Sequence, residues 1–421
     1  MKRSTIELCI FLATVLAITL SSAGPTAAQN NTAFGSGALV SPSSPDLADS
    51  AFGFKALNSP TSGLDNTAIG AGALQSNTTG DSNTAGGRNA LFHNTAGFAN
   101  TAIGDFALSL NTTGGNNTGI GVNALQLNTI GSNNTASGVN ALFSNSTGFN
   151  NTANGFNALV SNTTGSGNTA SGLSALSRNT TGGNNTATGL EALFSNTTGN
   201  GNTAAGSAAL VSNTIGNFNT AAGNGALSDN TTGAFNTAAG AGALGLNSTG
   251  NQNTGVGQAA LHNNTSGQFN TAAGLNALVS NTDGNSNTAV GHGALNNSTT
   301  GSNNIGLGVK AGFNSTTGSN NIDIGNTGVA AESGTIRIGS QGTQTKTFLA
   351  GIFSSMVSGD AVMVSNTGQL GIAMSSARYK RDIRDMGSSS EALMKLRPVT
   401  FRYRNDPSQQ RQYGLVAEEV A

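Results

Sequence analysis

The sequence predicts an all-β repeat protein, a parallel β-solenoid or β-roll of 17-residue coils, followed by a small α+β domain at the C-terminus. A unit of fixed length recurs through most of the chain, and two glycines recur at fixed places within it. A fixed period of this size is typical of solenoids, in which one coil cannot bury its apolar face without its neighbours. The composition agrees, because 8% charged and 5% aromatic residues are too few for an ordinary globular enzyme.

The repeat reads Asn-Thr-Ala-x-Gly-x-x-Ala-Leu-x-x-Asn-Thr-Thr-Gly-x-x, as in residues 66–82. Its first Asn returns every 17 residues from Asn66 to Asn321, which gives sixteen copies in register. Two earlier copies begin at Asn31 and Asp49. The glycines are incompatible with a long helix, and 17 is not a multiple of the heptad, so the coils are expected to be β.

Two glycines and one apolar pair define each coil. Gly holds the fifth position of all eighteen copies, and a second Gly ends the Asn-Thr-Thr-Gly segment in sixteen, so we expect turns that need positive φ or close backbone approach. Asn beside such turns is expected to bond nearby backbone. The Ala-Leu pair is present in sixteen copies and should form one internal row. One Leu and a few Ala make a thin core, and sharing it among chains would bury more, so we expect a trimeric rod.

The segments Thr67 to Gly70 and Thr101 to Gly104 contain the Ala-Ile-Gly sequence. In this the chain resembles the head repeats of trimeric autotransporter adhesins, although repeats in that family are usually shorter. The resemblance implies a trimeric, left-handed parallel β-roll that binds a host cell surface or its glycans.

Charge and residue placement argue against several ligands. A net charge of −1 predicts no general attraction to nucleic acid or to an anionic membrane. Aligned threonines are one form of ice-binding surface, but the Asn-Thr pair serves turns equally well. Calcium-binding solenoids need Asp at fixed positions, whereas here Asp is scattered, and the histidines (His93, His262 and His292) occupy different repeat positions. We therefore expect neither a metal nor a cofactor.

Residues 1–28 have the features of a secretory signal peptide. Lys2 and Arg3 form a basic end, an apolar stretch follows, and Thr26-Ala27-Ala28 offers small residues for cleavage. The alternative is an uncleaved anchor, but the apolar stretch is shorter than the ~20 residues that span a bilayer. The single cysteine, Cys9, lies in this segment. We expect a secreted or surface-exposed protein with no disulfide and no membrane-spanning helix after cleavage.

Residues 29–329 are assigned to the solenoid and residues 330–374 to a β cap or neck. In this neck the strand-like pieces are residues 335–338, 347–350 and 361–364, and a turn at Asn366-Thr367-Gly368 precedes a last piece at 369–374.

Residues 375–421 change in composition and contain all three tyrosines. Ser388-Ser389-Ser390-Glu391 reads as a capping box that opens a helix through about Leu396, which Pro398 ends. Val399 to Tyr403 alternates as a strand, and Tyr413 to Val420 begins another strand or helix.

Three ordered blocks in this segment carry a second resemblance. They are Ser375-Ser376-Ala377-Arg378-Tyr379-Lys380-Arg381-Asp382-Ile383, Leu393-x-x-Leu396-Arg397-Pro398-Val399-Thr400-Phe401 and Tyr413-Gly414-Leu415-Val416-Ala417-Glu418-Glu419-Val420. They resemble the self-cleaving intramolecular chaperone of phage tail spikes and endosialidases. Related domains continue with additional helix beyond the position of Ala421, so we expect only part of such a domain here.

In that family the domain helps fibre chains to trimerise and then cuts itself off before the first Ser of the motif. The resemblance implies that Ser375 is the nucleophile, Lys380 its base and Met374-Ser375 the scissile bond. A Ser hydroxyl needs a neighbour to take its proton, and a neutral Lys can do so. Burial or nearby cations such as Arg378, Arg381 and Arg384 would favour that neutral form. Family motifs often have Asp where this chain has Ser376, which is a second candidate nucleophile.

These observations predict a secreted trimeric fibre, tail-fibre-like or adhesin-like, whose enzymatic activity is at most one self-cleavage by a Ser-Lys autoprotease. One alternative is a carbohydrate-binding or carbohydrate-cleaving protein like a tail spike, and cleavage would need paired carboxylates at a groove. Another is a passive β-rod with an inactive end domain.

Overall fold

The structure is a computed structural model, and it describes residues 31–40, 48–59, 61–349, 362–372, 381–384, 386–391, 395–402 and 411–416. The expected signal peptide lies outside these residues. The chain divides into two compact units, Met1–Ile338 and Gly339–Ala421. In the described ranges, no helix is long and apolar enough to span a bilayer.

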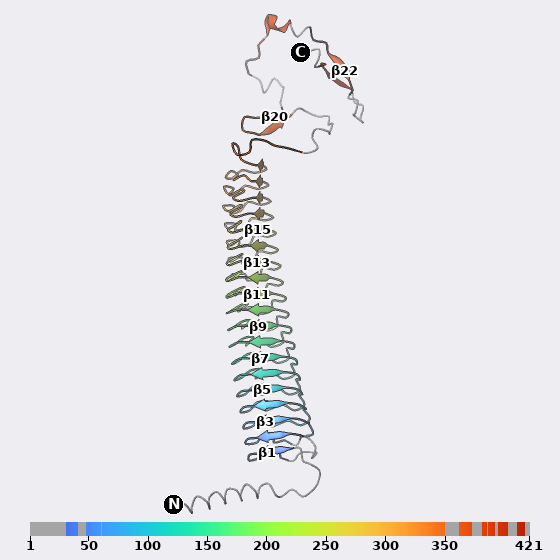
Figure 1. Cartoon of the computed structure of the whole chain (residues 1–421), viewed down its shortest axis with the longest axis vertical. Helices are drawn as coiled ribbons and strands as arrows, with labels where there is room; N and C mark the ends of the chain where they lie inside the picture. Colours follow the sequence, from blue (N-terminus) through green and yellow to red (C-terminus); the bar gives the residue numbers. More distant parts are fainter. Residues whose placement is uncertain are drawn as a thin grey trace, which may run out of the picture. The chain divides into compact units, whose positions relative to one another are not determined.

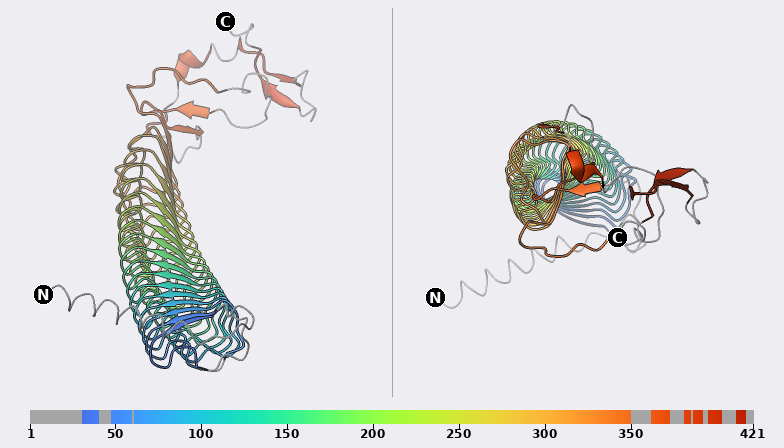
Figure 2. Two further views of the ribbon diagram at one scale, coloured as in Figure 1. Left: turned by 60° about the horizontal axis from the view of Figure 1, so that its bottom comes forward. Right: turned by 90° about the horizontal axis from the view of Figure 1, so that it is seen from above.

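The first unit is a parallel β-solenoid in which each coil contributes one short strand. Each strand pairs in parallel with the strand of the following coil, so that the strands lie over one another along the column (Figures 1 and 2). The nineteen strands are β1 (Thr32–Phe34), β2 (Ser50–Phe52), β3 (Thr67–Ile69), β4 (Thr84–Gly86), β5 (Thr101–Ile103), β6 (Thr118–Ile120), β7 (Thr135–Ser137), β8 (Thr152–Asn154), β9 (Thr169–Ser171), β10 (Thr186–Thr188), β11 (Thr203–Ala205), β12 (Thr220–Ala222), β13 (Thr237–Ala239), β14 (Thr254–Val256), β15 (Thr271–Ala273), β16 (Thr288–Val290), β17 (Ile305–Leu307), β18 (Ile322–Ile324) and β19 (Ile336–Ile338). The prediction of β coils stacked in register is confirmed.

The two recurring glycines act for the two reasons that the sequence suggests. Gly172, at the fifth position, ends β9 with φ +139°, which side chains rarely adopt. Gly182, at the second glycine position, does not have a positive φ, but a Cβ there would lie 2.5 Å from the Gly199 carbonyl oxygen of the next coil. Close backbone approach therefore requires Gly at this second position.

The Ala-Leu pairs form the apolar core. The leucines of these pairs, from Leu57 to Leu295, have no exposed surface, and the same holds for the alanine that precedes each of them. The prediction of one internal Leu row is confirmed. Each chain closes this core without a partner, so the argument that a thin core must be shared among chains is not supported, and trimerisation remains a proposal.

The leucines adopt a backbone conformation that the sequence does not suggest. Leu176, for example, has φ +52°, in the left-handed region that is uncommon for a branched apolar residue. Burial of the side chain in the core and the bond from the Leu176 N–H to the Ala192 carbonyl oxygen, 3.0 Å, hold this conformation in place.

Two rows of buried asparagines run beside the apolar core. The first asparagine row holds the first residue of each repeat and the second asparagine row holds the twelfth; both are fully buried in almost every coil. Members of the first row are Asn66, Asn83, Asn100, Asn117, Asn134, Asn151, Asn168, Asn185, Asn202, Asn219, Asn236, Asn253, Asn270, Asn287, Asn304 and Asn321. Members of the second row are Asn77, Asn94, Asn111, Asn128, Asn145, Asn162, Asn179, Asn196, Asn213, Asn230, Asn247, Asn264 and Asn281.

Each asparagine of the first row bonds to its own coil and to both neighbouring coils. The backbone N–H of Asn168 donates to Asn151 Oδ1 at 3.0 Å, and its side-chain Nδ2 donates to the Gly182 carbonyl at 2.8 Å. Asn168 Oδ1 in turn accepts from the Asn185 N–H at 3.0 Å. In the second row, Asn179 Nδ2 donates to the same Gly182 carbonyl at 2.9 Å. Such ladders satisfy polar groups that would otherwise be buried at a cost of free energy.

The ladder of strands extends beyond residue 329, where we placed the end of the solenoid. The strand predicted at residues 335–338 is confirmed as β19, but it pairs in parallel with β18 and completes the stack. The strand predicted at 347–350 is wrong for residues 347–349, which have no regular structure; Ala350 lies outside the described residues.

The second unit contains two antiparallel strand pairs. The strands β20 (Val362–Val364) and β21 (Leu370–Ile372) form a hairpin, and the predicted turn is confirmed by the bond from the Gly368 N–H to the Ser365 carbonyl, 2.9 Å. The second pair joins β22 (Val399–Phe401) to β23 (Gln412–Gly414).

The helix predicted from Ser388 is wrong in type. The described residues form a 3-10 helix, η2 (Gly387–Ser390), and residues 392–394 lie outside the description. Met386 is at the N-cap and makes no capping bond with its side chain, so the expected capping box does not form at Ser388. Serines compete for backbone hydrogen bonds and are poor residues for continuing a helix, which accounts for the short turn.

Candidate functional site

The residues expected to perform cleavage, Met374, Ser375 and Lys380, lie outside the described residues, as does Ser376. Of the arginines expected to favour a neutral Lys380, Arg381 and Arg384 are described, and both are exposed. The arrangement of the Ser-Lys pair therefore remains a prediction.

The structure does bring two of the three sequence blocks of this segment together. β22 ends the second block and β23 begins the third, and the register pairs Val399 with Gly414 and Thr400 with Tyr413. A Cβ on Gly414 would lie 3.1 Å from Cε1 of Phe401, so a side chain at Gly414 would crowd the aromatic ring. The end of the second block and the start of the third block are thus neighbours in one antiparallel strand pair.

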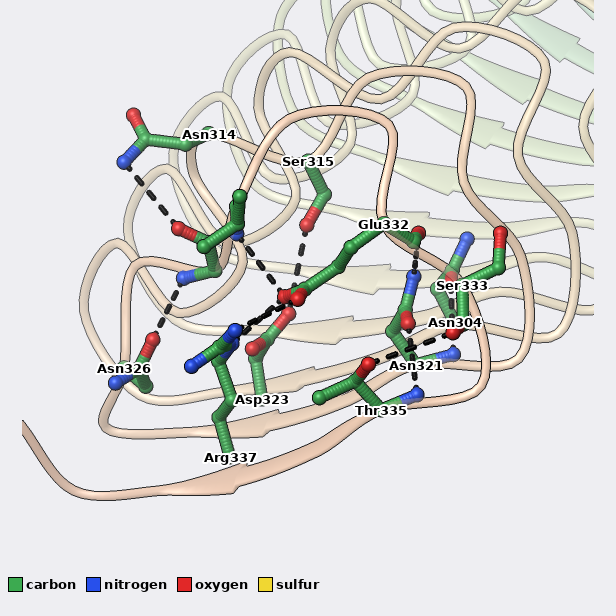
Figure 3. A network of polar contacts seen from close by, with 12 residues as sticks. Asn304, Asn314, Ser315, Asn321, Asp323, Asn326, Glu332, Ser333, Thr335 and Arg337 are labelled. Carbon is green, nitrogen blue, oxygen red and sulfur yellow. Dashed lines mark hydrogen bonds and ion pairs between the residues drawn. The ribbon is translucent and has the colours of Figure 1, made fainter. Parts of the chain in front are cut away.

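A polar cluster ends the apolar core at the last coils of the solenoid (Figure 3). Gly312 stands where earlier coils have Leu, and Asp323 stands where they have the inward Ala of the strand. A Cβ on Gly312 would lie 2.5 Å from Cδ2 of Leu295 and 3.0 Å from Oδ2 of Asp323, so these two side chains occupy the place of the missing Leu. The column therefore changes from an apolar to a polar interior at its end.

The first asparagine row ends in the same cluster. Asn321 donates from Nδ2 to the Glu332 carbonyl at 2.8 Å, and its Oδ1 accepts from the Thr335 N–H at 3.1 Å. The last coil is shorter than the others, and these two groups replace the Gly carbonyl and the following Asn of a full coil (Figure 3). The row is thereby satisfied at its C-terminal end.

An ion pair lies beside the buried carboxylate of Asp323. Arg337 donates from Nε and Nη2 to the two carboxylate oxygens of Glu332, both at 2.7 Å. This bidentate bond lowers the pKa of Glu332 and raises that of Arg337. Burial, followed by repulsion from Glu332, raises the pKa of Asp323, against the bond that Ser315 Oγ donates to it at 3.4 Å.

This cluster does not have the properties of a glycosidase site. Asp323 and Glu332 are two neighbouring carboxylates, but Asp323 is only 1% exposed and Glu332 is bonded to Arg337. A pair of catalytic carboxylates must reach a substrate from both sides of the scissile bond. The arrangement instead ends the stack with groups on which a further apolar coil cannot pack. Among the residues that the structure describes, no group of three or more His, Cys, Asp or Glu side chains could hold a metal ion.

The C-terminal segment is similar to a known protein family. The model of the family described as the chaperone of endosialidase matches residues 375–421. The expected resemblance of this segment is thereby confirmed. No curated protein matches the chain. The protein thus combines a β-solenoid fibre with a C-terminal segment similar to the endosialidase chaperone, an organisation like that of a tail fibre.

The sequence interpretation missed the two asparagine rows and the polar end cluster. For the rows a signal was present, since Asn holds the first position of the repeat in seventeen of the eighteen copies and the twelfth position in thirteen. For the cluster the signal is that two core positions change near the end of the repeats. Gly312 replaces the core Leu of one coil, and Asp323 replaces the strand Ala of the next.

Proposed function

We propose that the protein is a secreted or surface-exposed trimeric fibre, whose C-terminal segment assists assembly and then cleaves itself off between Met374 and Ser375. The observation that carries this proposal is the match of residues 375–421 to the endosialidase chaperone family, in a chain whose β-solenoid ends at Ile338. The long regular rod supplies a fibre, and the matched segment supplies a means of aligning its chains.

The proposed cleavage uses the chain's own residues. Lys380, in its neutral form, takes the proton of the Ser375 hydroxyl, and Ser375 Oγ attacks the carbonyl carbon of Met374. The bond from that carbon to the Ser375 nitrogen breaks, and this nitrogen takes the proton from Lys380 and leaves as an amine, so Met374 is held as an ester on Ser375 Oγ. Water then hydrolyses the ester, releasing a fibre that ends at Met374 and a fragment that begins with Ser375.

Intact-mass analysis of the secreted product tests the cleavage. We expect a fibre chain ending at Met374, with its N-terminus after Ala28 if the signal peptide is removed there. Ser375→Ala and Lys380→Ala should each leave the chain uncut, because nucleophile and base work as a unit.

Ser376→Ala is the matched control and should still be cut. Loss of cutting in Ser376→Ala but not in Ser375→Ala would place the nucleophile at the second serine. An uncut wild-type trimer would contradict the cleavage while leaving assembly in place, and the end segment would then be an inactive cap on a passive rod.

A second candidate function, binding of surface glycans, is favoured by an aromatic pair on the outside of the rod. Phe218 and Phe235 lie in adjacent coils with their rings stacked at 5.3 Å between centroids, and they are 57% and 58% exposed. Asn200, which is exposed, and Asn217, which is half-buried, hold amides in the neighbouring positions. Flat apolar rings beside amide groups suit the apolar face and hydroxyls of a sugar.

A glycan array on the wild-type protein and on Phe218→Ala/Phe235→Ala tests this function. We expect binding that the double variant loses, whereas Phe149→Ala, an exposed aromatic at another position of the repeat, should keep it. Equal binding by all three proteins would exclude the aromatic pair as the sugar site.

A further inference from the structure

Five successive coils carry a large apolar side chain at the sixth position of the repeat. These residues, which we call the apolar ridge, are 41–51% exposed: Val122, Val139, Phe156, Leu173 and Leu190. In most other coils this position holds Arg, Asp, Ser, Asn, Gln, His or Ala. Eight coils in all carry a large apolar side chain at this position; five of them are successive, and the other three are the coils of Phe54, Leu275 and Val309.

The backbone beneath the ridge is fixed by bonds between coils. The carbonyl of each ridge residue accepts a hydrogen bond from the next coil: Val122 from the Asn140 N–H at 3.0 Å, Phe156 from the Ser174 N–H at 2.9 Å. The strands just before the ridge pair in register, so ridge residues follow one another at the strand spacing, about 4.8 Å. The ridge is thus a continuous, preformed row.

Polar residues surround the ridge. At its N-terminal end the sixth position holds Arg88 and Asp105, which form an exposed ion pair at 3.2 Å, and at its C-terminal end it holds Ser207. Along one side runs a row of asparagine amides, in which Asn123 Nδ2 donates to Asn140 Oδ1 at 3.1 Å. On the other side the outward residues of the strands are mostly polar: Ser137, Asn154, Ser171 and Thr188. An apolar centre with a polar rim is typical of an interaction surface.

The spacing and charge of the ridge fit a second copy of this chain better than another partner. A partner must present apolar groups at the same interval over five coils, and a second solenoid of the same repeat does so. The ridge residues carry no charge, so identical ridges do not repel each other. Half-exposed side chains of this size present on the order of 500 Å² per chain, so three ridges that meet bury on the order of 1,500 Å² in the whole trimer, the size of a standard specific interface.

We infer that the apolar ridge is the surface through which copies of the chain meet, side by side and parallel, in the fibre. This inference rests on the proposed trimeric assembly and assigns its contact surface. Around a three-fold axis each chain contributes one ridge, and identical residues meet at the same height, Phe156 against Phe156. An antiparallel arrangement of the same ridge joins only two chains.

Single-cysteine variants of the full chain test the inference. In a Cys9→Ser background, Val122→Cys and Phe156→Cys should form disulfides between chains on mild oxidation, seen as a dimer band on a non-reducing gel. Thr164→Cys, an exposed position elsewhere on the coil, is the matched control and should stay monomeric on the gel. Crosslinking at 156 without crosslinking at 122 would indicate antiparallel pairs and overturn the parallel arrangement.

Light scattering on charged variants completes the test. Phe156→Asp should lower the fraction of trimer at least tenfold at micromolar concentration, with the β-sheet circular dichroism unchanged because the side chain is exposed. Ile215→Asp, equally exposed at another repeat position, should leave the trimer intact. A trimer that neither crosslinks at Val122 or Phe156 nor dissociates in Phe156→Asp would overturn the ridge and leave the trimeric fibre standing. A monomeric wild-type protein would overturn both.

Discussion

Replacing Asn168 by alanine removes one amide from the first asparagine row in the middle of the rod. Asn168 has no exposed surface and is bonded to three other residues through its side chain. After the change the Asn185 N–H, which donates to Asn168 Oδ1 at 3.0 Å, is left buried without an acceptor. The Gly182 carbonyl loses one donor but keeps Asn179 Nδ2 at 2.9 Å.

The cost follows from these contacts. A buried donor without a partner costs roughly 1–3 kcal/mol, and the lost bond to Gly182 adds about 1 kcal/mol. We therefore expect a local loss of about 2–4 kcal/mol. The matched control is Asn154→Ala, the same substitution on the exposed face of β8, at a position where β11 and β12 already have Ala. An exposed change of this kind is expected to cost less than about 0.5 kcal/mol.

Hydrogen exchange followed by mass spectrometry is the suitable assay, because a stack of repeats need not unfold in one step. At about 1.4 kcal/mol per factor of ten, amides in the coils of Asn168 and Asn185 should exchange roughly 30- to 1,000-fold faster in Asn168→Ala. Amides several coils away should change far less. Equal exchange in Asn168→Ala and Asn154→Ala would refute the claim that the asparagine rows hold the coils together.

Leu176→Asp places an unpaired charge in the core and should lower the stability by several kcal/mol. Thr163→Ala removes one hydrogen bond to the Thr180 carbonyl, 3.0 Å long, and should lower the stability by less than about 1.5 kcal/mol. Equal denaturation midpoints for the two variants would exclude the Leu row as the core. Gly182→Ala puts a Cβ 2.5 Å from backbone of the next coil and should destabilise by at least about 1–3 kcal/mol, measured by hydrogen exchange. Burial raises the pKa of Asp49 above its ordinary value of 3.8, so the folded state holds the proton more tightly than the unfolded state. The stability from the protonated form is complete below the unfolded pKa and is lost as pH rises through the folded pKa. Asp49→Asn should therefore slow exchange in the N-terminal coils at pH 7 and remove this pH dependence, and faster exchange would contradict the argument.

The repeat made the coil and its core predictable because the same residues recur at the same places. Gly172 and Gly182 each stand where backbone geometry leaves no room for a side chain, and the Leu row follows from sixteen identical pairs. The left-handed φ of Leu176 was not predictable, since local preference argues against it and only packing between coils holds it.

The asparagine rows show the limit of reading one coil at a time. Asn is a common turn residue, so its recurrence at two positions was interpreted as turn chemistry. Its burial depends on amides of neighbouring coils that stand in register, such as Asn151 and Asn185 around Asn168, and these contacts exist only in the stack. The closure of the apolar core within one chain also depends on contacts between coils. Because the core is closed, its thinness is no longer a reason to expect a trimer.

For residues 375–421 the sequence predicted the family resemblance correctly but only part of the secondary structure. The three blocks correspond to the family match over residues 375–421, and the structure pairs Val399–Phe401 with Gln412–Gly414. The α-helix expected from Ser388 was wrong for the described residues, because the turn there is the 3-10 helix η2 with Met386, not Ser388, at its N-cap.

Native mass spectrometry of the secreted wild-type protein tests the central claim most directly, because one spectrum reports both the number of chains and the mass of each chain. The account predicts a particle of three chains, each ending at Met374, which survives after the C-terminal fragment has been released. A spectrum of single chains that retain Ser375 and all residues after it would contradict both the assembly and the cleavage.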